Sequence, residues 1–297
     1  MMRLASENIP GEAMSETIDC ILCRNAGQRP LFTKPAENGE LFRLVQCTSC
    51  GLRYLSPRPA PDEIGRYYTR KYFTRRTDRG YDDYFSDELR REIERVMELN
   101  LRDLGFYRFE ESLTDPRRVL DIGCAAGYFV AYMKNRGWDS QGIDISADCV
   151  RHAKERLSLD VRCGDYLTGE YRDKFHLITL WASLEHLHRP DLFLEKIHSD
   201  LAEGGRLYLT TCRAGGASFM RFFGQNWRFY NFPEHLYFFS YSQLKRLLEM
   251  KGFRVERCIT YGSGWGKPGG RCRKAADYLA RHWKMGDMML ISAVRAR

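Results

Sequence analysis

The sequence lacks any apolar run of the roughly 20 residues that a membrane-spanning helix needs. Its first residues, MMRLASENIPGEAMSETID, also lack the apolar core of a secretory signal peptide. We find neither an internal repeat nor a low-complexity tract, so the chain does not have the signature of a repeat protein. These absences predict a cytoplasmic protein with no membrane span and a disordered leader over residues 1–17.

Disulfide bonds are not expected either, because the 10 cysteines lie in a chain without an export signal. Free buried cysteine behaves as a small apolar residue, and most of the scattered cysteines are expected to pack in this way. The scattered set comprises Cys124, Cys149, Cys163, Cys212, Cys258 and Cys272.

The remaining cysteines form two C-x-x-C pairs, Cys20/Cys23 and Cys47/Cys50. Two such pairs can supply four thiolates to one tetrahedral Zn²⁺, and Gly51 allows the tight turn of the second pair. Four protein ligands leave no open position, so the pattern predicts a structural zinc ribbon over residues 18–55. Iron remains an alternative metal, and a redox pair of thiols remains an alternative to metal binding.

Acidic residues are in deficit: 47 Lys and Arg outnumber 39 Asp and Glu, for a formal net charge of +8. The surplus is concentrated in Arg53–Arg79 and Lys267–Lys284. A basic surface attracts nucleic acid, anionic lipid or phosphorylated small molecules. A solvated face with no partner explains the same pattern, and both interpretations stay open.

Apolar periodicity divides the rest of the chain into two parts. Residues 56–115 are predicted to form a helical cap, with an amphipathic helix over Asp87–Leu104. Residues 116–297 alternate strands with helices, as a doubly wound α/β domain does. The predicted strands are Arg118–Ile122, Ser140–Ile143, Asp160–Arg162, His176–Leu180, Arg206–Thr211, Arg254–Thr260 and Met288–Val294.

A turn of small residues follows the first of these strands in VLDIGCAAGYFVAYMKNRGWDSQGIDIS. Glycine and alanine let the backbone bend sharply and let a ligand lie against it, and ligands of open α/β sheets bind at the carboxyl ends of strands. Only two glycines, Gly123 and Gly127, stand here, so the turn suits a pyrophosphate less well than G-x-G-x-x-G does. Asp144 closes the next strand, where an acidic residue can accept hydrogen bonds from ribose hydroxyls.

The D-x-G-x-x-x-G pattern resembles that of class I S-adenosylmethionine (SAM)-dependent methyltransferases, in which the loop wraps the methionine part of SAM. Cys163–Tyr166, LITLWASLEHLHRPDLFLEKI and GGRLYLTT resemble further segments of that family, in the family's order. The resemblance implies a Rossmann-like seven-stranded methyltransferase domain over residues 116–297. The SAM-binding residues that it implies are Asp121, Gly123, Cys124, Gly127, Asp144, Ile145, Asp165, Tyr166 and Trp181.

With its cysteine pairs, the chain also resembles bacterial sugar and natural-product methyltransferases that carry an N-terminal zinc-binding domain, including the deoxysugar C-methyltransferases. In that branch a Glu-His pair lines the substrate pocket, which implies this role for Glu234 and His235, with His235 as general base. Phe232-Pro233 replaces the Tyr-His that precedes the pair there, which disfavours C-methylation of a keto-sugar.

Methyl transfer from a sulfonium is an in-line displacement, and a hydroxyl acceptor additionally needs a base near neutral pH. His186, just past the fourth predicted strand, is a second candidate base, and a reaction without a protein base is a third reading. The predicted substrate is therefore a small molecule, such as a sugar, glycolipid or biosynthetic intermediate, methylated on oxygen rather than carbon or nitrogen.

Two other functions stay open at this point. An RNA methyltransferase could grip nucleic acid with its zinc ribbon, although LWASLEHL lacks the (N/D)-P-P-(Y/F) pattern of enzymes that methylate base amino groups. A SAM-binding protein without turnover is the other. The aromatic stretch between Trp227 and Phe239 suits either a substrate lid or ordinary core.

Overall fold

The computed structural model describes residues 15–68, 70–74, 83–215, 220–265 and 271–296. Its centre is a seven-stranded sheet whose order is β12-β13-β10-β9-β6-β7-β8. The strands are β6 (Arg118–Ile122), β7 (Asp139–Asp144), β8 (Asp160–Cys163), β9 (Phe175–Trp181), β10 (Leu201–Cys212), β12 (Phe253–Tyr261) and β13 (Met288–Arg295). All seven predicted strands are confirmed, as is the Rossmann-like fold.

Neighbouring strands from β8 to β10 are parallel, whereas β13 runs antiparallel to both β10 and β12. The chain moves outward from β6 through β7 to β8, and then returns to β9 on the other side of β6. The strand order therefore reverses between β6 and β9. Open α/β sheets bind ligands at the carboxyl ends of the strands beside such a reversal.

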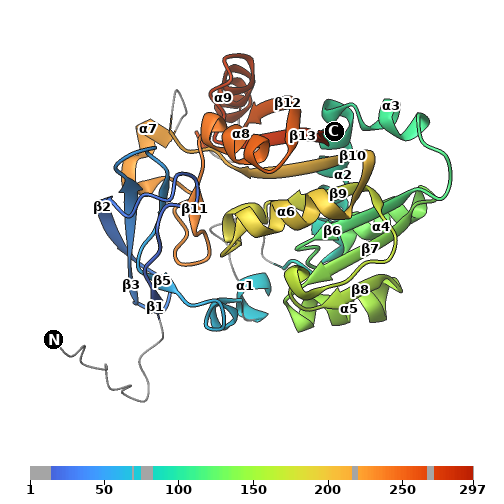
Figure 1. Cartoon of the computed structure of the whole chain (residues 1–297), viewed down its shortest axis with the longest axis horizontal. Helices are drawn as coiled ribbons and strands as arrows, with labels where there is room; N and C mark the ends of the chain where they lie inside the picture. Colours follow the sequence, from blue (N-terminus) through green and yellow to red (C-terminus); the bar gives the residue numbers. More distant parts are fainter. Residues whose placement is uncertain (1–14, 69, 75–82, 216–219, 266–270, 297) are drawn as a thin grey trace.

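Helices cover both faces of this sheet (Figure 1). They are α2 (Asp87–Leu104), α3 (Phe106–Glu111), α4 (Tyr128–Asn135), α5 (Ala147–Leu157), α6 (Pro190–Asp200), α8 (Tyr241–Met250) and α9 (Arg271–His282). Side chains alternate between the faces of a strand: Val119 packs with residues of α2, α3 and α4, and Leu120 packs with residues of α6 and α8. No helix among the described residues is both long and apolar enough to cross a bilayer.

Helix α2 has the bounds that its apolar spacing predicts. The Ser86 hydroxyl accepts a hydrogen bond from the Leu89 amide and so caps the first turn, beside Asp87 and Glu88, whose charges suit a helix N-terminus. Gly105, with a φ of 78°, ends the helix in the left-handed conformation that glycine adopts without strain. The chain then reaches β6 through α3.

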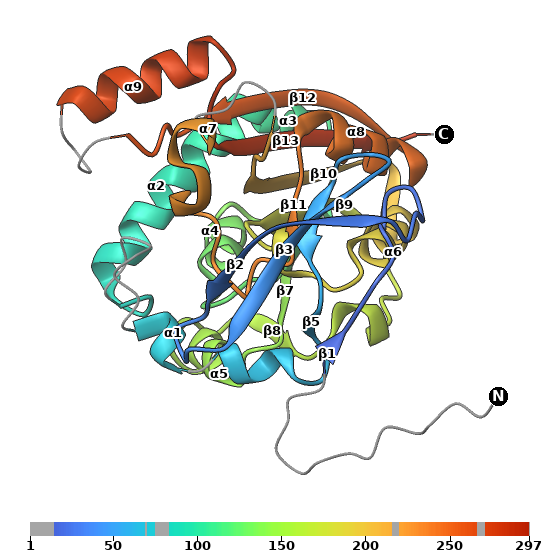
Figure 2. The ribbon, with the colours of Figure 1, turned by 90° about the vertical axis from the view of Figure 1, so that its left-hand side faces the viewer.

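A second, four-stranded sheet has the order β11-β4-β3-β2 and lies beside the large one (Figures 1 and 2). It contains β2 (Gln28–Pro35), β3 (Leu41–Cys47), β4 (Arg53–Leu55) and β11 (Tyr237–Phe238). The predicted zinc ribbon supplies the first three strands, and β11 comes from the segment that follows the predicted Glu-His pair. The N-terminal module and the methyltransferase region therefore share one sheet.

The predicted leader over residues 1–17 needs a correction at its end. Residues 1–14 lie outside the described residues, but Ser15 and Glu16 form β1, which pairs with β5 (Arg58–Pro59). Arg58 explains the pairing: it is only 2% exposed and donates to Glu16, to the Tyr237 hydroxyl and to the carbonyl oxygen of residue 188. A buried guanidinium needs such partners, so the chain around residue 16 is held in place.

The remaining elements join these layers. Between β5 and α2 lie the short helices η1 (Ile64–Tyr67) and α1 (Arg70–Thr74). The 3-10 helices η3 (Tyr166–Thr168) and η4 (Leu184–His186) follow β8 and β9, and α7 (Met220–Phe223) and η5 (Gly224–Asn226) lie between β10 and β11.

Candidate active site

The loop of small residues after β6 lies at the carboxyl edge of the sheet. Its conformation requires those residues, since φ is 72° at Gly123, 46° at Ala125 and 80° at Gly127. The amides of Gly123 and Cys124 both donate to the Ile143 carbonyl oxygen, at 2.8 and 3.2 Å. The loop is therefore fixed to the neighbouring strand β7, beside the strand-order reversal.

The two glycines are needed for a different reason than the sequence suggests. A Cβ on Gly127 would lie 2.8 Å from Leu159 Cδ1 and 3.1 Å from Ala153 Cβ, and a Cβ on Gly123 would lie 2.6 Å from Ser183 Oγ. The atoms that an added Cβ would meet all belong to side chains of the protein and not to a ligand. Close packing of the loop against its own neighbours, rather than the approach of a ligand alone, excludes larger residues here.

Asp144, at the end of β7, holds the loop from the other side. Its two carboxylate oxygens accept hydrogen bonds from the amides of Ala125 and Ser146, each at 2.8 Å. Burial raises the pKa of Asp144, and these two amides oppose the rise. Because each carboxylate oxygen can accept a second hydrogen bond, the residue fits the predicted contact to ribose hydroxyls.

Asp121, at the end of β6, is fully buried. Burial raises its pKa to about 8; a hydrogen bond from Thr179 on β9, at 2.6 Å, opposes the rise, and the nearby Asp144 adds to it. A carboxyl group that is largely protonated at neutral pH would be stabilised in its charged form by a cationic ligand. The ammonium group of SAM is such a ligand.

The other predicted cofactor residues lie in different surroundings. Ile145 is 53% exposed and offers an apolar surface beside Asp144. Trp181, at the end of β9, buries its Nε1 atom, which has no hydrogen-bond partner within the described part of the chain. This buried donor at the carboxyl edge fits a site that takes a polar ligand. The Cys124 side chain packs in the core between α4 and α5, so only its backbone faces the loop.

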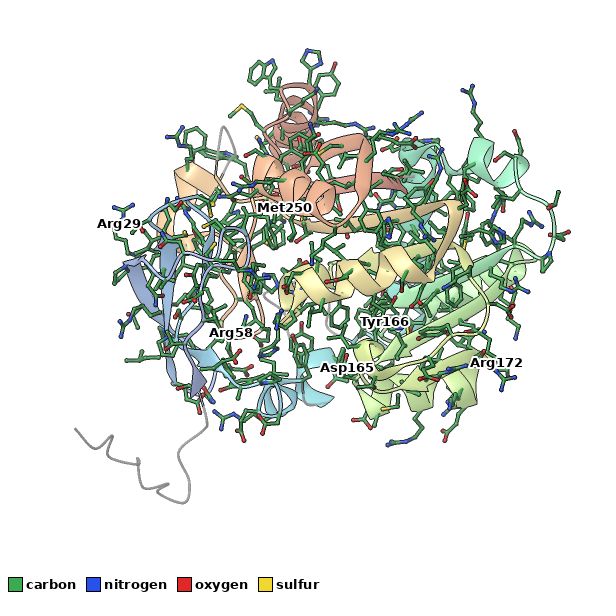
Figure 3. All side chains as sticks on the ribbon, viewed as in Figure 1. Arg29, Arg58, Asp165, Tyr166, Arg172 and Met250 are labelled. Carbon is green, nitrogen blue, oxygen red and sulfur yellow. The ribbon has the colours of Figure 1, made fainter. Side chains whose placement is uncertain are left out.

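Asp165 and Tyr166, which the resemblance implies as SAM-binding residues, follow β8 (Figure 3). Asp165 is exposed, and its Oδ1 accepts a hydrogen bond from the Leu167 amide, which caps η3. Tyr166 is buried beneath α6, where its hydroxyl donates to Asp200 at 2.7 Å. The Tyr166 side chain therefore packs in the core and does not face the predicted cofactor site, because its ring fits between η3 and α6 rather than at the strand ends.

The three predicted catalytic residues come from two segments that meet at this edge. His186 lies on η4 after β9, and Glu234 and His235 precede β11. The His186 and His235 rings stand edge to face with their centroids 4.6 Å apart, and His235 is only 4% exposed. Glu234 is buried next to His235.

Sequence reasoning missed two members of this cluster. Potential ligand atoms of Glu185, His186 and His235 all lie within 4.8 Å of one another. The Tyr68 hydroxyl lies 2.7 Å from His186 Nδ1. The available signal was the repetition of Glu-His, at 185–186 and again at 234–235. Such a group can share a proton between imidazole and carboxylate, and its donor set would also suit a divalent cation.

Backbone hydrogen bonds join this cluster to the N-terminal module. The Leu236 amide donates to the Glu185 carbonyl oxygen at 2.8 Å, and the Leu55 amide donates to the Leu236 carbonyl oxygen at 3.0 Å. Leu236 thus connects η4 to β4 directly after His235. The segment that carries His235 is held between the two sheets.

The four paired cysteines of the N-terminal module converge. Cys20 Sγ lies 3.4 Å from Cys50 Sγ, Cys23 Sγ lies 3.5 Å from Cys47 Sγ, and all four sulfurs lie within 4.8 Å of one another. Tetrahedral Zn²⁺ with bonds of about 2.3 Å separates its sulfur ligands by about 3.8 Å. The arrangement fits a four-thiolate zinc site.

The backbone around these cysteines forms two similar turns. The Arg24 amide donates to the Cys20 carbonyl oxygen, and the Gly51 amide donates to that of Cys47. Arg24 and Gly51 both have positive φ, at 60° and 73°. Burial acts to raise the pKa of Cys47, but hydrogen bonds from the backbone of Cys50 and Ser49 outweigh it and lower that pKa to about 7. Burial raises the pKa of Cys20 and that of Cys50, so this ease of deprotonation does not extend to all four thiols.

The aromatic stretch belongs mainly to the core. The buried members are Trp227, Tyr230, Phe232, Tyr237, Phe238 and Phe239. Phe229 is only partly buried, and its ring stacks against that of His235 with centroids 6.3 Å apart. Of the two readings of this stretch, core packing therefore applies to most of it, and both the partly buried Phe229 and the buried Phe238 lie beside the candidate base.

The chain is similar to known methyltransferases. Residues 88–257, more than half of the chain, match the family described as methyltransferase domain. The mitochondrial ubiquinone biosynthesis O-methyltransferase of Saccharomyces cerevisiae is 30% identical over 195 residues, which cover 57% of this chain and 59% of that protein. The Nitrobacter winogradskyi ubiquinone biosynthesis O-methyltransferase is 32% identical over 107 residues, which cover 34% of this chain and 41% of that one.

The chain spans about half the length of the curated relatives it matches. Among solved structures, a SAM-dependent methyltransferase from Archaeoglobus fulgidus shares the fold, with a TM-score of 0.50 and 22% identity over 68% of this chain and 94% of that one. The strand order of the large sheet and the conformation of the loop after β6 are both those expected from the family match. The chain belongs to the methyltransferase domain family.

Proposed function

We propose that this enzyme transfers the methyl group of SAM to a hydroxyl oxygen of a small molecule, with His235 as the general base. The observation that carries the proposal is the convergence of Glu185, His186 and His235 at the carboxyl edge of the sheet. A hydroxyl acceptor needs a base to take its proton, and imidazole performs that work near neutral pH.

SAM supplies an electrophilic methyl group on a sulfonium. The protein's part is to hold it: the loop from Gly123 to Gly127 would carry the amino-acid end beside Asp121, and Asp144 would accept from the ribose hydroxyls. Ile145 would cover an apolar face of the nucleoside, and Asp165 would receive the adenine amino group through its second carboxylate oxygen. Positioning of this kind provides much of the acceleration in a displacement reaction.

The acceptor side is assigned to the histidine cluster. His235 would take the acceptor proton, and Glu185 would stabilise the imidazolium that forms. Two adjacent imidazolium rings repel each other because they carry like charges, so only one of the two rings would be cationic at a time. Tyr68, hydrogen bonded to His186 Nδ1, would fix the orientation of that ring. The relatives named as O-methyltransferases support a hydroxyl acceptor.

We also propose that Cys20, Cys23, Cys47 and Cys50 bind one structural Zn²⁺. Sulfur separations of 3.4 and 3.5 Å and the two similar turns support this assignment. A module of this size has a small core, and metal binding would contribute to its folding free energy. No open position is left for chemistry in a site with four protein ligands.

The test uses the purified full chain, SAM with a deuterated methyl group, and a metabolite extract from a strain that lacks the gene. We expect mass spectrometry to find an extract component that gains one deuterated methyl group as an ether. His235→Gln should lower the rate by about 100-fold or more while SAM affinity stays unchanged. The matched control, exposed His282→Gln, should leave the rate unchanged.

Four results would contradict this reading. Label transferred to RNA would favour the nucleic-acid alternative, and label on nitrogen or carbon would exclude the hydroxyl acceptor. Full activity of His235→Gln would remove the proposed base. The Cys47→Ser variant lacks the proposed zinc site. If a chelator abolished turnover in this variant too, the cluster of Glu185, His186 and His235 would be a cation site rather than a proton acceptor.

A further inference from the structure

Helix α9 is exposed along most of its length, although it carries large apolar side chains. Tyr278 is 69% exposed, Trp283, just after the helix, is 60% exposed, and Leu279 is 38% exposed. Figure 2 shows α9 projecting beyond β12 at the margin of the molecule. Monomeric proteins seldom leave several large apolar side chains together in water without a partner.

The inner face of α9 is anchored. Ala280 is fully buried, and Asp277 accepts hydrogen bonds from the Ser263 amide and hydroxyl, each at 2.6 Å, and from Arg273 at 2.8 Å. Asp277 is also the single acidic residue between Arg271 and Lys284. The helix is therefore held through one face. Asp277, the one acidic residue of this segment, lies on that face and is hydrogen bonded there.

A second exposed aromatic group lies by the same anchor. Trp265, 48% exposed, donates its amide to Ser263 Oγ at 3.2 Å. Its ring stands edge to face with that of Phe222 on α7, which is 66% exposed, at a centroid distance of 6.3 Å. Exposed rings therefore lie on both α7 and α9, joined through Ser263.

The outer face of α9 is positively charged as well as apolar. At 100° per residue, Leu279 and Trp283 project on one side of the outer face, and Arg271, Lys274 and Tyr278 project on the adjoining side. Arg271 and Lys274 are exposed. Cations next to Trp, Tyr and Leu are the composition of helices that lie in the plane of a bilayer interface.

We propose that α9 and the adjoining Phe222–Trp265 pair form a docking surface for an anionic lipid bilayer. The aromatic and aliphatic side chains would enter the headgroup region, and the cations would meet lipid phosphates. Nucleic acid fits less well, because readers of single strands line a basic groove with their rings, whereas this surface is a projecting helix with an aliphatic member. The inference is independent of the acceptor proposed above.

The experiment measures co-sedimentation of the full chain with vesicles of phosphatidylcholine, with and without phosphatidylglycerol. Binding should require phosphatidylglycerol and weaken with salt. One unit of charge at an anionic surface changes partitioning about fivefold, so Lys274→Glu should weaken binding roughly 25-fold. Arg172→Glu, a charge reversal at an exposed site on another part of the chain (Figure 3), should lower binding far less.

The apolar contribution has its own matched pair. Trp283→Ser should lower binding about tenfold, whereas Met250→Ser, at a comparably exposed position on α8, should not. Retained affinity for S-adenosylhomocysteine shows that each variant is folded. Absence of binding to phosphatidylglycerol vesicles would overturn the proposal, and so would equal losses in variants and controls. Tighter binding to RNA than to vesicles, lost in the same two variants, would also overturn it.

Discussion

Gly127 allows a sharp test of the cofactor loop, because the chain contains a matched control. Gly127 and Gly137 have nearly the same positive φ, 80° and 82°. Alanine at either position pays the cost of a left-handed L-residue, about 1–2 kcal/mol. The two sites differ in what the added methyl group would meet.

At Gly137 the nearest atom to the new Cβ is the end of Arg117, at 3.6 Å, so no further cost is expected. At Gly127 the Cβ would lie 2.8 Å from Leu159 Cδ1 and 3.1 Å from Ala153 Cβ, both in a buried cluster. Overpacking of a well-packed core costs about 1–3 kcal/mol. We therefore expect Gly127→Ala to lose about 2–5 kcal/mol of unfolding free energy and Gly137→Ala about 1–2 kcal/mol.

Urea unfolding measures the stability loss, and calorimetry with S-adenosylhomocysteine measures its effect on the site. The displaced loop should weaken cofactor binding at least about tenfold in Gly127→Ala, which corresponds to 1.4 kcal/mol, and should leave it unchanged in Gly137→Ala. Unchanged affinity in Gly127→Ala at a reduced stability would show that the loop does not hold the cofactor. Equal stability losses in the two variants would refute the steric reasoning.

Three further outcomes are expected. Because burial raises the pKa of Asp121 to about 8, the folded state holds the Asp121 proton more tightly than the unfolded chain does. The stability that this group contributes is therefore complete below about pH 4 and is lost as pH rises to about 8. Urea unfolding of Asp121→Asn should lack this pH-dependent contribution, and the same dependence of stability on pH in Asp121→Asn and the unmodified protein would contradict the reasoning. Metal analysis should find about one zinc per chain, lost in Cys47→Ser and kept in Cys272→Ser; zinc retained in Cys47→Ser would refute the four-thiolate site. Arg58→Met should lower the free energy of unfolding by about 2–3 kcal/mol in urea, because it leaves buried partners without their hydrogen-bond donor, whereas exposed Arg66→Met should lower it by less than about 1 kcal/mol. Equal losses in the two variants would exclude Arg58 as an anchor.

The large sheet could be predicted from the sequence because its information is local. Strand β6 has the predicted bounds, and the alternation of short strand-like segments with helical stretches located the other six. Strand β10 begins at Leu201 rather than at the predicted Arg206, because Leu201 already pairs with Phe175 on β9, ahead of an irregularity in the pairing that contains Gly204, with a φ of 71°. Helix α2 carries its own start and stop signals in Ser86 and Gly105.

Features that depend on distant partners could not be predicted. Strand β11 is two residues long and pairs with Tyr54 and Arg53, which lie far away in the sequence. Nothing in a single strand of that length specifies its register. The direction of the Tyr166 side chain could not be predicted for a related reason: its position after β8 fixes the backbone, but Asp200 on α6 decides where the ring points. The cytoplasmic location and the domain boundaries stay predictions.

Hydrogen-bonded strands connect the proposed zinc site to the cluster of Glu185, His186 and His235. This connection explains why an enzyme of this fold would keep a metal-binding module. The thiolates of Cys47 and Cys50 flank the end of β3 and the turn into β4, and β4 pairs with β11 directly after His235. Hydrogen bonds through Leu236 continue this connection to Glu185. A catalytic group must be held within a fraction of an ångström, and loops alone seldom achieve this. A zinc ion at the far end of a short, rigid sheet would supply that constraint without touching the substrate, so the base would be positioned by the module and the cofactor by the large sheet.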